Sequence, residues 1–283
     1  MSALRIPFAM ASNLEQAFKG AIAAAGLTPP TEIIDDGVIH RFSTNGKSTR
    51  KNSWYMLHTD GIAAGAFGDW REGLTQNWCS KADTTMTEAE RIAHRERVNA
   101  MQRQREDDLA QRQQLAAADA LKRWTAATPC AQHDYLTRKG IQPHGAKMEG
   151  DKLLIPMRDT AGTVHSLQTI APDGTKMFMS GGRVKGCYFG IGKPKGALIV
   201  CEGFSTGASI HECTGHAVAV AFNAGNLEAV AVGLRNKYPT LKIIIAADDD
   251  HQTPGNPGMT KATAAVQATG ATLAVPVFKA AAA

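Results

Sequence analysis

The sequence predicts an α/β fold, in which a parallel sheet covered by helices forms the C-terminal part of the chain. Two short runs, residues 198–203 and 243–250, are continuously apolar and then end in acidic residues. Apolar runs of this length that are rich in Ile and Val are typical of strands buried on both faces, as in a parallel sheet. Helical segments separate the runs, which completes the alternation of strand and helix that defines this fold class.

The acidic residues fall at the carboxyl ends of the predicted strands, with Glu202 after the first run and Asp248, Asp249 and Asp250 after the other. Ligands of open α/β sheets bind at this edge, because the connecting loops diverge there. In extended backbone Asp248 and Asp250 share a side. Carboxylates gathered in one crevice favour a hard cation, Mg²⁺ or Mn²⁺, over zinc. The alternative is that the acids begin helices, where the helix dipole stabilises them.

These motifs resemble the Toprim domain, which bacterial-type primases, topoisomerases and some nucleases share. A Glu-Gly pair follows the first strand, an Asp-x-Asp motif follows the third, and Gly258 and Lys261-Ala262 open the next helix. The resemblance covers residues 197–278. It implies a catalytic role for Glu202, Asp248 and Asp250, and a site for two divalent ions that Asp249 assists. It also implies that Lys261 can reach a phosphate.

Residues 1–82 are predicted to form a small β-rich domain. Residues 13–25 are rich in Ala and precede Gly26, which predicts a helix. Residues 38–42 and 53–58 have strand character, and Asp60-Gly61 predicts a hairpin turn into residues 62–67.

Aromatic and basic residues are interleaved in this domain, and two interpretations stay open. The rings can stack on bases beside cations that hold phosphates, as on a single-strand binding surface. Alternatively, they form the core of the domain. The candidate nucleic-acid-binding residues are Arg41, Lys47, Arg50, Lys51, Trp54, Tyr55, Trp70 and Arg71.

Residues 83–128 are predicted to form a long, charged linker helix. Thr87 to Glu90 is a capping box, and neither Gly nor Pro occurs from there to Thr125. The apolar positions are too sparse for a continuous stripe, so we expect a solvated helix rather than a coiled coil.

Residues 129–196 are predicted to form a basic antiparallel platform with a helix at 133–139 and strands at 152–158, 163–170 and 176–179. Residues 138–196 contain 10 Lys and Arg but 4 Asp and Glu. Such a surplus suits a polyanionic ligand, although a solvated basic face is the alternative. The element order resembles the subdomain that precedes the Toprim domain in bacterial-type primases. That resemblance implies that Lys176 and Lys185 face nucleotide and template, with Arg158 as a weaker match.

Residues 197–283 are predicted to form the Toprim domain itself. Periodicity predicts helices at 204–213, 227–237 and 260–268, and further strands at 217–222, 241–247 and 272–275.

Composition limits the class of protein. The chain has 283 residues and 43% hydrophobic residues, and its five cysteines include no Cys-x-x-Cys pair, so we expect neither a disulfide framework nor a zinc ribbon. No apolar stretch approaches the roughly 20 residues that span a bilayer. We therefore expect a cytoplasmic protein with no membrane partner.

Two other motifs are weaker. Gly203-Phe204-Ser205-Thr206-Gly207 fits the nucleophile elbow of α/β-hydrolases, but no suitable His follows, so we expect Ser205 or Thr206 to cap a helix. The Gly-rich basic segments do not fit a P-loop. Unwinding of DNA would therefore need a separate helicase or replication protein.

Together these patterns predict a DNA primase that uses single-stranded DNA and nucleoside triphosphates to make short RNA primers by metal-assisted nucleotidyl transfer. The N-terminal composition resembles primases carried by plasmids and phages. A Toprim nuclease that activates water with the same carboxylates is the first alternative. A non-catalytic module that binds single-stranded DNA is the second.

Overall fold

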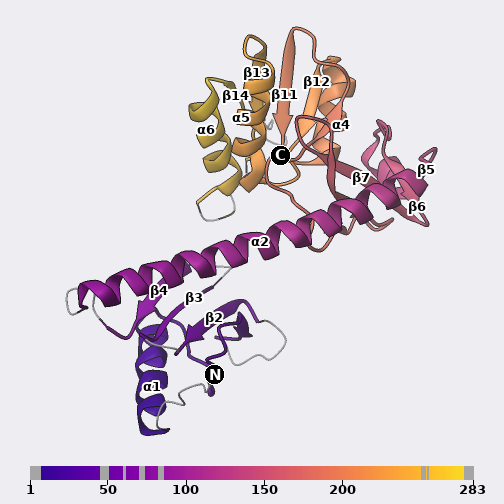
Figure 1. Cartoon of the computed structure of the whole chain (residues 1–283). Coiled ribbons are helices and arrows are strands. Elements are labelled where there is room, and N and C mark those ends of the chain that lie inside the picture. Colours follow the sequence, from indigo (N-terminus) through magenta and orange to yellow (C-terminus); the bar gives the residue numbers. More distant parts are fainter. Residues whose placement is uncertain are drawn as a thin grey trace, which may run out of the picture. The chain divides into compact units, whose positions relative to one another are not determined.

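The computed structural model describes residues 8–44, 51–59, 62–69, 74–81, 86–249, 253 and 255–276. The chain divides into two compact units, Met1–Gln104 and Arg105–Ala283. The division falls inside the long helix α2 (Glu88–Ala126), which is labelled in Figure 1. No helix in the described ranges combines the length and the apolar character that a bilayer span requires.

The first unit contains helix α1 (Phe8–Ala24) and an antiparallel sheet in the order β1-β2-β3-β4. The strands are β1 (His40–Phe42), β2 (Ser53–His58), β3 (Ala64–Asp69) and β4 (Leu74–Cys79). Helix α1 inserts Phe18 between aromatic side chains of the sheet, at 6.2 Å from the ring of Tyr55 and 5.8 Å from that of Phe67. The predicted strand at 53–58 is confirmed, whereas the predicted Asp60-Gly61 turn lies outside the described residues.

Helix α2 begins with the predicted capping box. The amide of Thr87 donates to Glu90 Oε2 at 2.8 Å, and the amide of Glu90 donates to Thr87 Oγ1 at 3.3 Å. Hydrogen bonds from Lys81 and then from Thr87 lower the pKa of Glu90 to about 2. The box therefore satisfies amides that the first helical turn leaves without partners.

The prediction of a fully solvated linker helix is wrong for the last part of α2. Ala116 is 7% exposed and Ala120 is fully buried. Ala120 and Trp124 pack in a cluster with Leu154 and Leu167. The small Ala side chains allow the end of α2 to lie close to a sheet. A search for a continuous stripe of large apolar residues does not detect such a contact.

That sheet has the order β5-β6-β7-β8-β9 and is antiparallel; we call it the platform. Its strands are β5 (Thr128–Pro129), β6 (Lys147–Glu149), β7 (Lys152–Arg158), β8 (Val164–Ile170) and β9 (Lys176–Phe178). The short helix α3 (Asp134–Lys139) begins after the N-cap His133 and ends at Gly140, whose φ of 64° favours glycine.

The second sheet of this unit has the order β10-β12-β11-β13-β14. Its strands are β10 (Phe189–Ile191), β11 (Ala197–Cys201), β12 (Ala217–Val220), β13 (Lys242–Ala246) and β14 (Thr272–Ala274). All neighbours are parallel except β10, which is antiparallel to β12. The predicted α/β architecture of the C-terminal part is thus confirmed.

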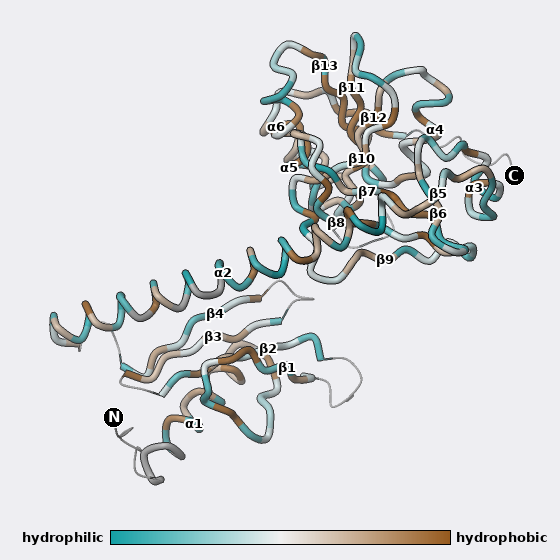
Figure 2. The backbone as a smooth tube through the Cα atoms, turned by 45° about the vertical axis from the view of Figure 1, so that its right-hand side comes forward, coloured by the Kyte–Doolittle hydropathy of each residue, from teal (hydrophilic) through white to brown (hydrophobic). Residues whose placement is uncertain are grey.

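Helices cover both faces of this second sheet. Helix α4 (Phe204–Thr214) lies on one side, while α5 (Leu227–Lys237) and α6 (Pro257–Thr269) lie on the other (Figure 1). Residues of β11 alternate between the two: Ile199 and Cys201 pack with α4, and Leu198 and Val200 pack with α5 and α6. Figure 2 shows β11 and β13 as apolar tube segments, in contrast with the mostly polar α2. Burial on both faces explains why the strand sequences are continuously apolar.

One predicted helix start and one predicted cap are wrong. Helix α6 begins at Pro257 and not at residue 260, because Asn256 caps it and Pro at the first position has a suitable φ. Helix α4 has Gly203 as its N-cap with no side-chain hydrogen bond, so neither Ser205 nor Thr206 caps it.

Gly207 allows α4 to lie close to the sheet. A Cβ at this position would lie 2.7 Å from Val220 Cγ2 and 3.1 Å from Cys201 Sγ. We expect Gly207→Ala to destabilise the protein by about 1–3 kcal/mol through overpacking, despite the better helix propensity of Ala. Thermal unfolding monitored by circular dichroism measures the change. In the matched control, Gly20→Ala in α1, the added Cβ meets nothing within 4 Å, so a stabilising effect of up to about 1 kcal/mol is expected. Equal effects of the two substitutions would contradict this account.

The two sheets of the second unit share one hydrophobic cluster. It contains Leu153 and Ile155 of the platform together with Cys201 of β11, Phe204 of α4 and Phe222, which follows β12. Backbone hydrogen bonds also join Arg158 to Tyr188, just before β10, at 3.0 and 2.8 Å. The boundary predicted between residues 196 and 197 therefore lies within a continuous core.

Glu212 on α4 binds the segment after α3 and so connects it to the helix that covers the second sheet. Its Oε1 accepts from the Gln142 amide at 2.8 Å and lies 2.5 Å from His144 Nε2. The Gln142 amide and His144 hold the pKa of Glu212 below its ordinary value.

A carboxyl whose pKa is depressed by folding stabilises the protein above its unfolded pKa, and this stabilisation is lost as pH falls through the lower, folded pKa. We expect stability to fall below about pH 4 and Glu212→Gln to flatten that part of the profile. Denaturant unfolding at a series of pH values tests this. An unchanged acid limb in the variant would show that other carboxyls control it.

Candidate active site

Two acidic residues lie at the carboxyl edge of the second sheet. Glu202 follows the last residue of β11, and Asp248 lies two residues beyond the end of β13, its parallel neighbour. Burial raises the pKa of the Cys201 thiol, and the charges of Asp248 and Glu202 raise it further. Because β11 and β13 are parallel neighbours, both carboxylates follow strands that end at the same edge of the sheet. The structure brings together the two acids that the sequence analysis placed at this edge.

Asp249 is held by a residue that the sequence analysis missed. Asn256 Nδ2 donates to Asp249 Oδ1 at 2.7 Å, while Asn256 Oδ1 accepts from the Met259 amide at 3.4 Å. Asn256 adopts a left-handed conformation, φ 40° and ψ 69°, which Asn tolerates better than most residues. The Asn-Pro pair at the start of α6 is the signal that could have identified this cap.

The donor set at this edge fits a hard cation. Glu202, Asp248 and Asp249 are half-buried and supply carboxylate oxygens, which Mg²⁺ and Mn²⁺ prefer. Among the residues that the structure describes, no three His, Cys, Asp or Glu side chains are arranged as metal ligands. Asp250, the remaining predicted ligand, lies outside those residues, so its alignment with Asp248 stays a prediction.

The predicted phosphate-binding cations differ in exposure and in the contacts that they make within the protein. Lys176, Lys185 and Lys261 are exposed. Arg158 is instead occupied within the platform: its NH1 donates to the carbonyl of Gly162 at 3.0 Å, and its guanidinium lies 5.7 Å from the ring centroid of Trp124. These contacts assign Arg158 a role in holding the turn between β7 and β8.

The loop that carries Lys185 is anchored by Asn226, which the sequence analysis also missed. Asn226 is 3% exposed. Its Oδ1 accepts from the Gly186 amide at 2.8 Å, and its Nδ2 donates to the carbonyls of Cys187 and Ala221, each at 2.9 Å. Ala221 directly follows β12. One side chain therefore ties the loop next to Lys185 to the carboxyl end of a sheet strand.

A second contact fixes the same loop. Arg183 NH2 lies 3.3 Å from Asp159 Oδ2, which also lies 2.8 Å from His165 Nε2. Burial raises the pKa of Asp159, but hydrogen bonds from His165 and from backbone amides outweigh it and leave the pKa below its ordinary value. Asp159 is thus ionised near neutral pH and holds Arg183 close to the platform.

Comparison with known proteins identifies the segment that carries the acids. Residues 197–282 match the family described as the Toprim domain. These residues form a Toprim domain. The family resemblance stated for this part of the sequence is confirmed.

Curated relatives extend the similarity beyond the Toprim domain. Two Escherichia coli proteins, each named DNA primase TraC, are 35% identical over 286 residues and 36% identical over 282 residues. The alignments cover 93% and 92% of this chain but only 26% and 19% of the two relatives. The chain therefore spans about a quarter of one relative and a fifth of the other.

A solved structure is similar over about half of the chain. It is the primase fragment of the bacteriophage T7 primase-helicase protein, 15% identical with a TM-score of 0.37, and the match covers 54% of this chain and 70% of that one.

The described N-terminal candidates lie apart from the Toprim domain in sequence, in the first unit, and they divide by exposure. Arg41 and Lys51 are exposed, but Trp54 is 8% and Tyr55 is 3% exposed. The Tyr55 hydroxyl accepts from the Ile34 amide at 3.0 Å. Of the two interpretations left open for these rings, their burial in hydrophobic clusters favours the one in which they form the core of the unit. Lys47, Arg50, Trp70 and Arg71 lie outside the described residues.

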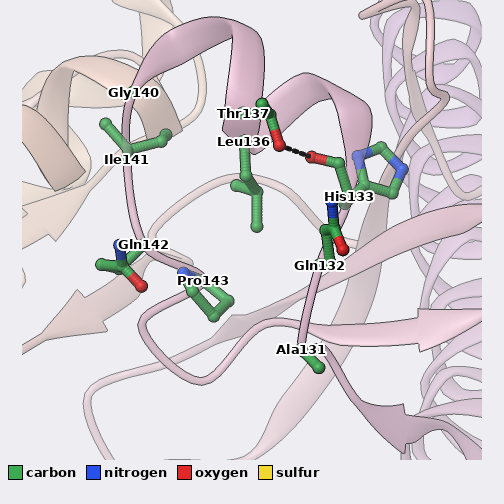
Figure 3. Close-up of a pocket in the computed structure, with 9 residues that line it drawn as sticks. All are labelled: Ala131, Gln132, His133, Leu136, Thr137, Gly140, Ile141, Gln142 and Pro143. Carbon is green, nitrogen blue, oxygen red and sulfur yellow. Dashed lines mark hydrogen bonds between the residues drawn. The ribbon is translucent and has the colours of Figure 1, made fainter.

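A cavity of about 320 Å³ lies beside α3, ahead of the Toprim domain in sequence. Residues 131–133, 136–137 and 140–143 line it, as Figure 3 shows. The Thr137 hydroxyl donates to the His133 carbonyl at 3.3 Å on its wall. None of the predicted site residues lines this cavity, so it is separate from the acidic edge.

Proposed function

We propose that this chain is a DNA primase that joins ribonucleotides into short primers on single-stranded DNA. The observation that carries the proposal is the placement of Glu202 and Asp248 directly after two neighbouring parallel strands, β11 and β13. It occurs at the edge of a Toprim sheet that shares its core with a lysine-bearing platform. The relatives named DNA primase support the same activity. The assignment of a separate role to the N-terminal unit, to the platform and to the Toprim domain is also part of this proposal.

The chemistry is attack by a 3′-hydroxyl on the α-phosphate of a nucleoside triphosphate, with pyrophosphate leaving. Glu202, Asp248 and Asp249, with Asp250, would hold one or two Mg²⁺ or Mn²⁺ ions. Such ions stabilise charge on the attacking and leaving oxygens. Glu202 either ligates metal or accepts the proton of the attacking hydroxyl at a carboxylate oxygen.

The cations of the second unit bind and orient the charged substrates. Lys176 and Lys185 neutralise phosphates of the nucleotide and of the template, and Lys261 on α6 reaches a further phosphate. Asn226 keeps the Lys185 loop in position through the three hydrogen bonds described above. We infer that a helicase or another replication protein supplies the single-stranded template.

Primer synthesis on a single-stranded DNA template tests the proposal. The full chain is incubated with labelled ribonucleotides and Mg²⁺ or Mn²⁺, and products are resolved on a sequencing gel. Short labelled RNA that depends on template supports the primase. Metal-dependent cutting of the template without synthesis identifies a Toprim nuclease instead, and DNA binding without either reaction identifies a binding module.

A further inference from the structure

Phe178 is an exposed aromatic residue on the platform. It is 40% exposed, and no other described Phe, Tyr or Trp side chain reaches this exposure. Strand β9, which carries it, is the last strand of the platform and pairs only with β8 among the described strands. The ring therefore borders an open sheet edge, along which a polymer can pass.

Phe178 shares a face of β9 with Lys176, because the two residues are separated by one position. Their partners on β8 are Gln168 and Ile170. Ile170 is fully buried in the cluster that also contains Phe222 of the Toprim domain. This face of the platform is therefore the one that packs toward the Toprim sheet.

Phe222 supports the ring of Phe178. The two ring centroids lie 6.3 Å apart with an interplanar angle of 80°, an edge-to-face arrangement. Phe222 comes shortly after β12, at the same carboxyl edge as Glu202 and Asp248. An edge-to-face contact occupies at most one edge or one face of the Phe178 ring, and the remaining aromatic surface is left for another partner.

The backbone of Phe222 is strained. Its φ is 73°, a left-handed conformation that L residues with large side chains rarely adopt. Strain of this kind persists where the surrounding structure imposes it, and it is concentrated at functional sites. The Phe222 residue that adopts this strained conformation is only 7% exposed, and its ring contacts the exposed ring of Phe178.

We propose that Phe178 stacks on a base of the single-stranded DNA template and that Lys176 binds an adjoining phosphate. This inference rests on the proposed function and adds a base-stacking residue to it. An aromatic face beside a cation on an open edge is suited to unpaired nucleic acid, because every base has a flat surface and every link a negative charge. Lys176 is available for this contact: its Nζ lies 5.9 Å from the Tyr135 ring centroid, and no carboxylate pairs with it in the part of the chain that the structure describes.

The occupant is the template rather than a nucleoside triphosphate. The phosphates of a nucleoside triphosphate would bind mainly to the divalent cations that the carboxylates would hold. Binding of a triphosphate is therefore expected to depend on metal. A stacked template base needs no metal. Binding through Phe178 is therefore expected to persist in EDTA.

The test measures binding of the full chain to a single-stranded oligonucleotide that contains 2-aminopurine, in EDTA. Anisotropy gives the dissociation constant, and quenching of 2-aminopurine reports stacking. Phe178→Leu keeps an apolar contact with Phe222 but removes the aromatic face. It is expected to weaken binding about 5- to 100-fold and to abolish part of the quenching. Phe178→Trp is expected to retain both.

Met177→Ala is the matched control, because Met177 is 63% exposed on the opposite face of the same strand. It is expected to bind like the wild type. Lys176→Gln is expected to lower the salt dependence of binding by about one unit of slope.

The outcomes separate this inference from the function it rests on. If the wild type synthesises primers and Phe178→Leu binds DNA with unchanged affinity and quenching, the stacking role is overturned. A raised KM for nucleotides with unchanged DNA affinity also overturns it, in favour of a nucleotide contact. If the wild type neither binds DNA nor synthesises primers, the proposed function itself fails.

Discussion

Asp248→Asn is expected to reduce primer synthesis by more than about 100-fold, since loss of residues that merely support a metal ligand commonly costs 10- to 100-fold. The substitution keeps the shape of the side chain but removes the charge that would hold a divalent ion. Glu202→Gln is expected to have the same effect on synthesis. Initial rates of primer formation at saturating nucleotide measure both losses.

Two controls make this result specific. Glu228→Gln removes an exposed carboxylate from α5 and is expected to leave synthesis unchanged. The thermal stability of Asp248→Asn is expected to match or exceed that of the wild type, because one of two like charges at the same edge of the sheet is removed. Full synthesis by the folded Asp248→Asn protein would remove Asp248 from the active site.

Asn226→Ala is expected to cause the largest loss of stability. It removes three hydrogen bonds and leaves backbone groups buried without partners, at a cost of roughly 1–3 kcal/mol for each such group. The three groups together give a loss of at least about 3 kcal/mol, which corresponds to a decrease in Tm of at least about 6 °C for a unit of this size. Differential scanning calorimetry measures the change.

The matched control is Asn236→Ala on α5, where the Asn is exposed, and its Tm is expected to change by little. At a temperature where Asn226→Ala remains folded, its KM for nucleotide or template is expected to rise, because the loop beside Lys185 is no longer fixed. If the Tm falls while KM stays constant, Asn226 stabilises the fold but does not position Lys185.

Local patterns in the sequence predicted most of the secondary structure. The strands at 53–58 and 152–158 were predicted with the bounds that the structure has, because strongly apolar or alternating runs mark them. The strands β4, β5, β6 and β10 were not predicted. β4 is rich in polar residues, and the others have only two or three residues, so pairing with a neighbour rather than local propensity defines them.

The same distinction applies to the candidate site. Glu202 and Asp248 could be predicted because each directly follows an apolar strand, and parallel strands end at one edge. Asn226 could not, because two of its partners, Gly186 and Cys187, lie 40 and 39 residues away in sequence. Trp54 and Tyr55 were ambiguous for a related reason: composition does not distinguish a ring that stacks on a ligand from one that fills a core.

The continuous core beneath the two sheets of the second unit limits how this protein can be recombined with others. Leu153 and Ile155 on one sheet and Cys201 and Phe222 on the other belong to the same cluster. A chimera that exchanges residues 197–282 alone would join halves of two unrelated interiors and leave mismatched volumes at their junction. A crossover near Arg105, where the second unit begins, transfers both sheets together with the part of α2 that packs on the platform. The unit that must be exchanged as a whole is therefore larger than the segment that matches the Toprim family.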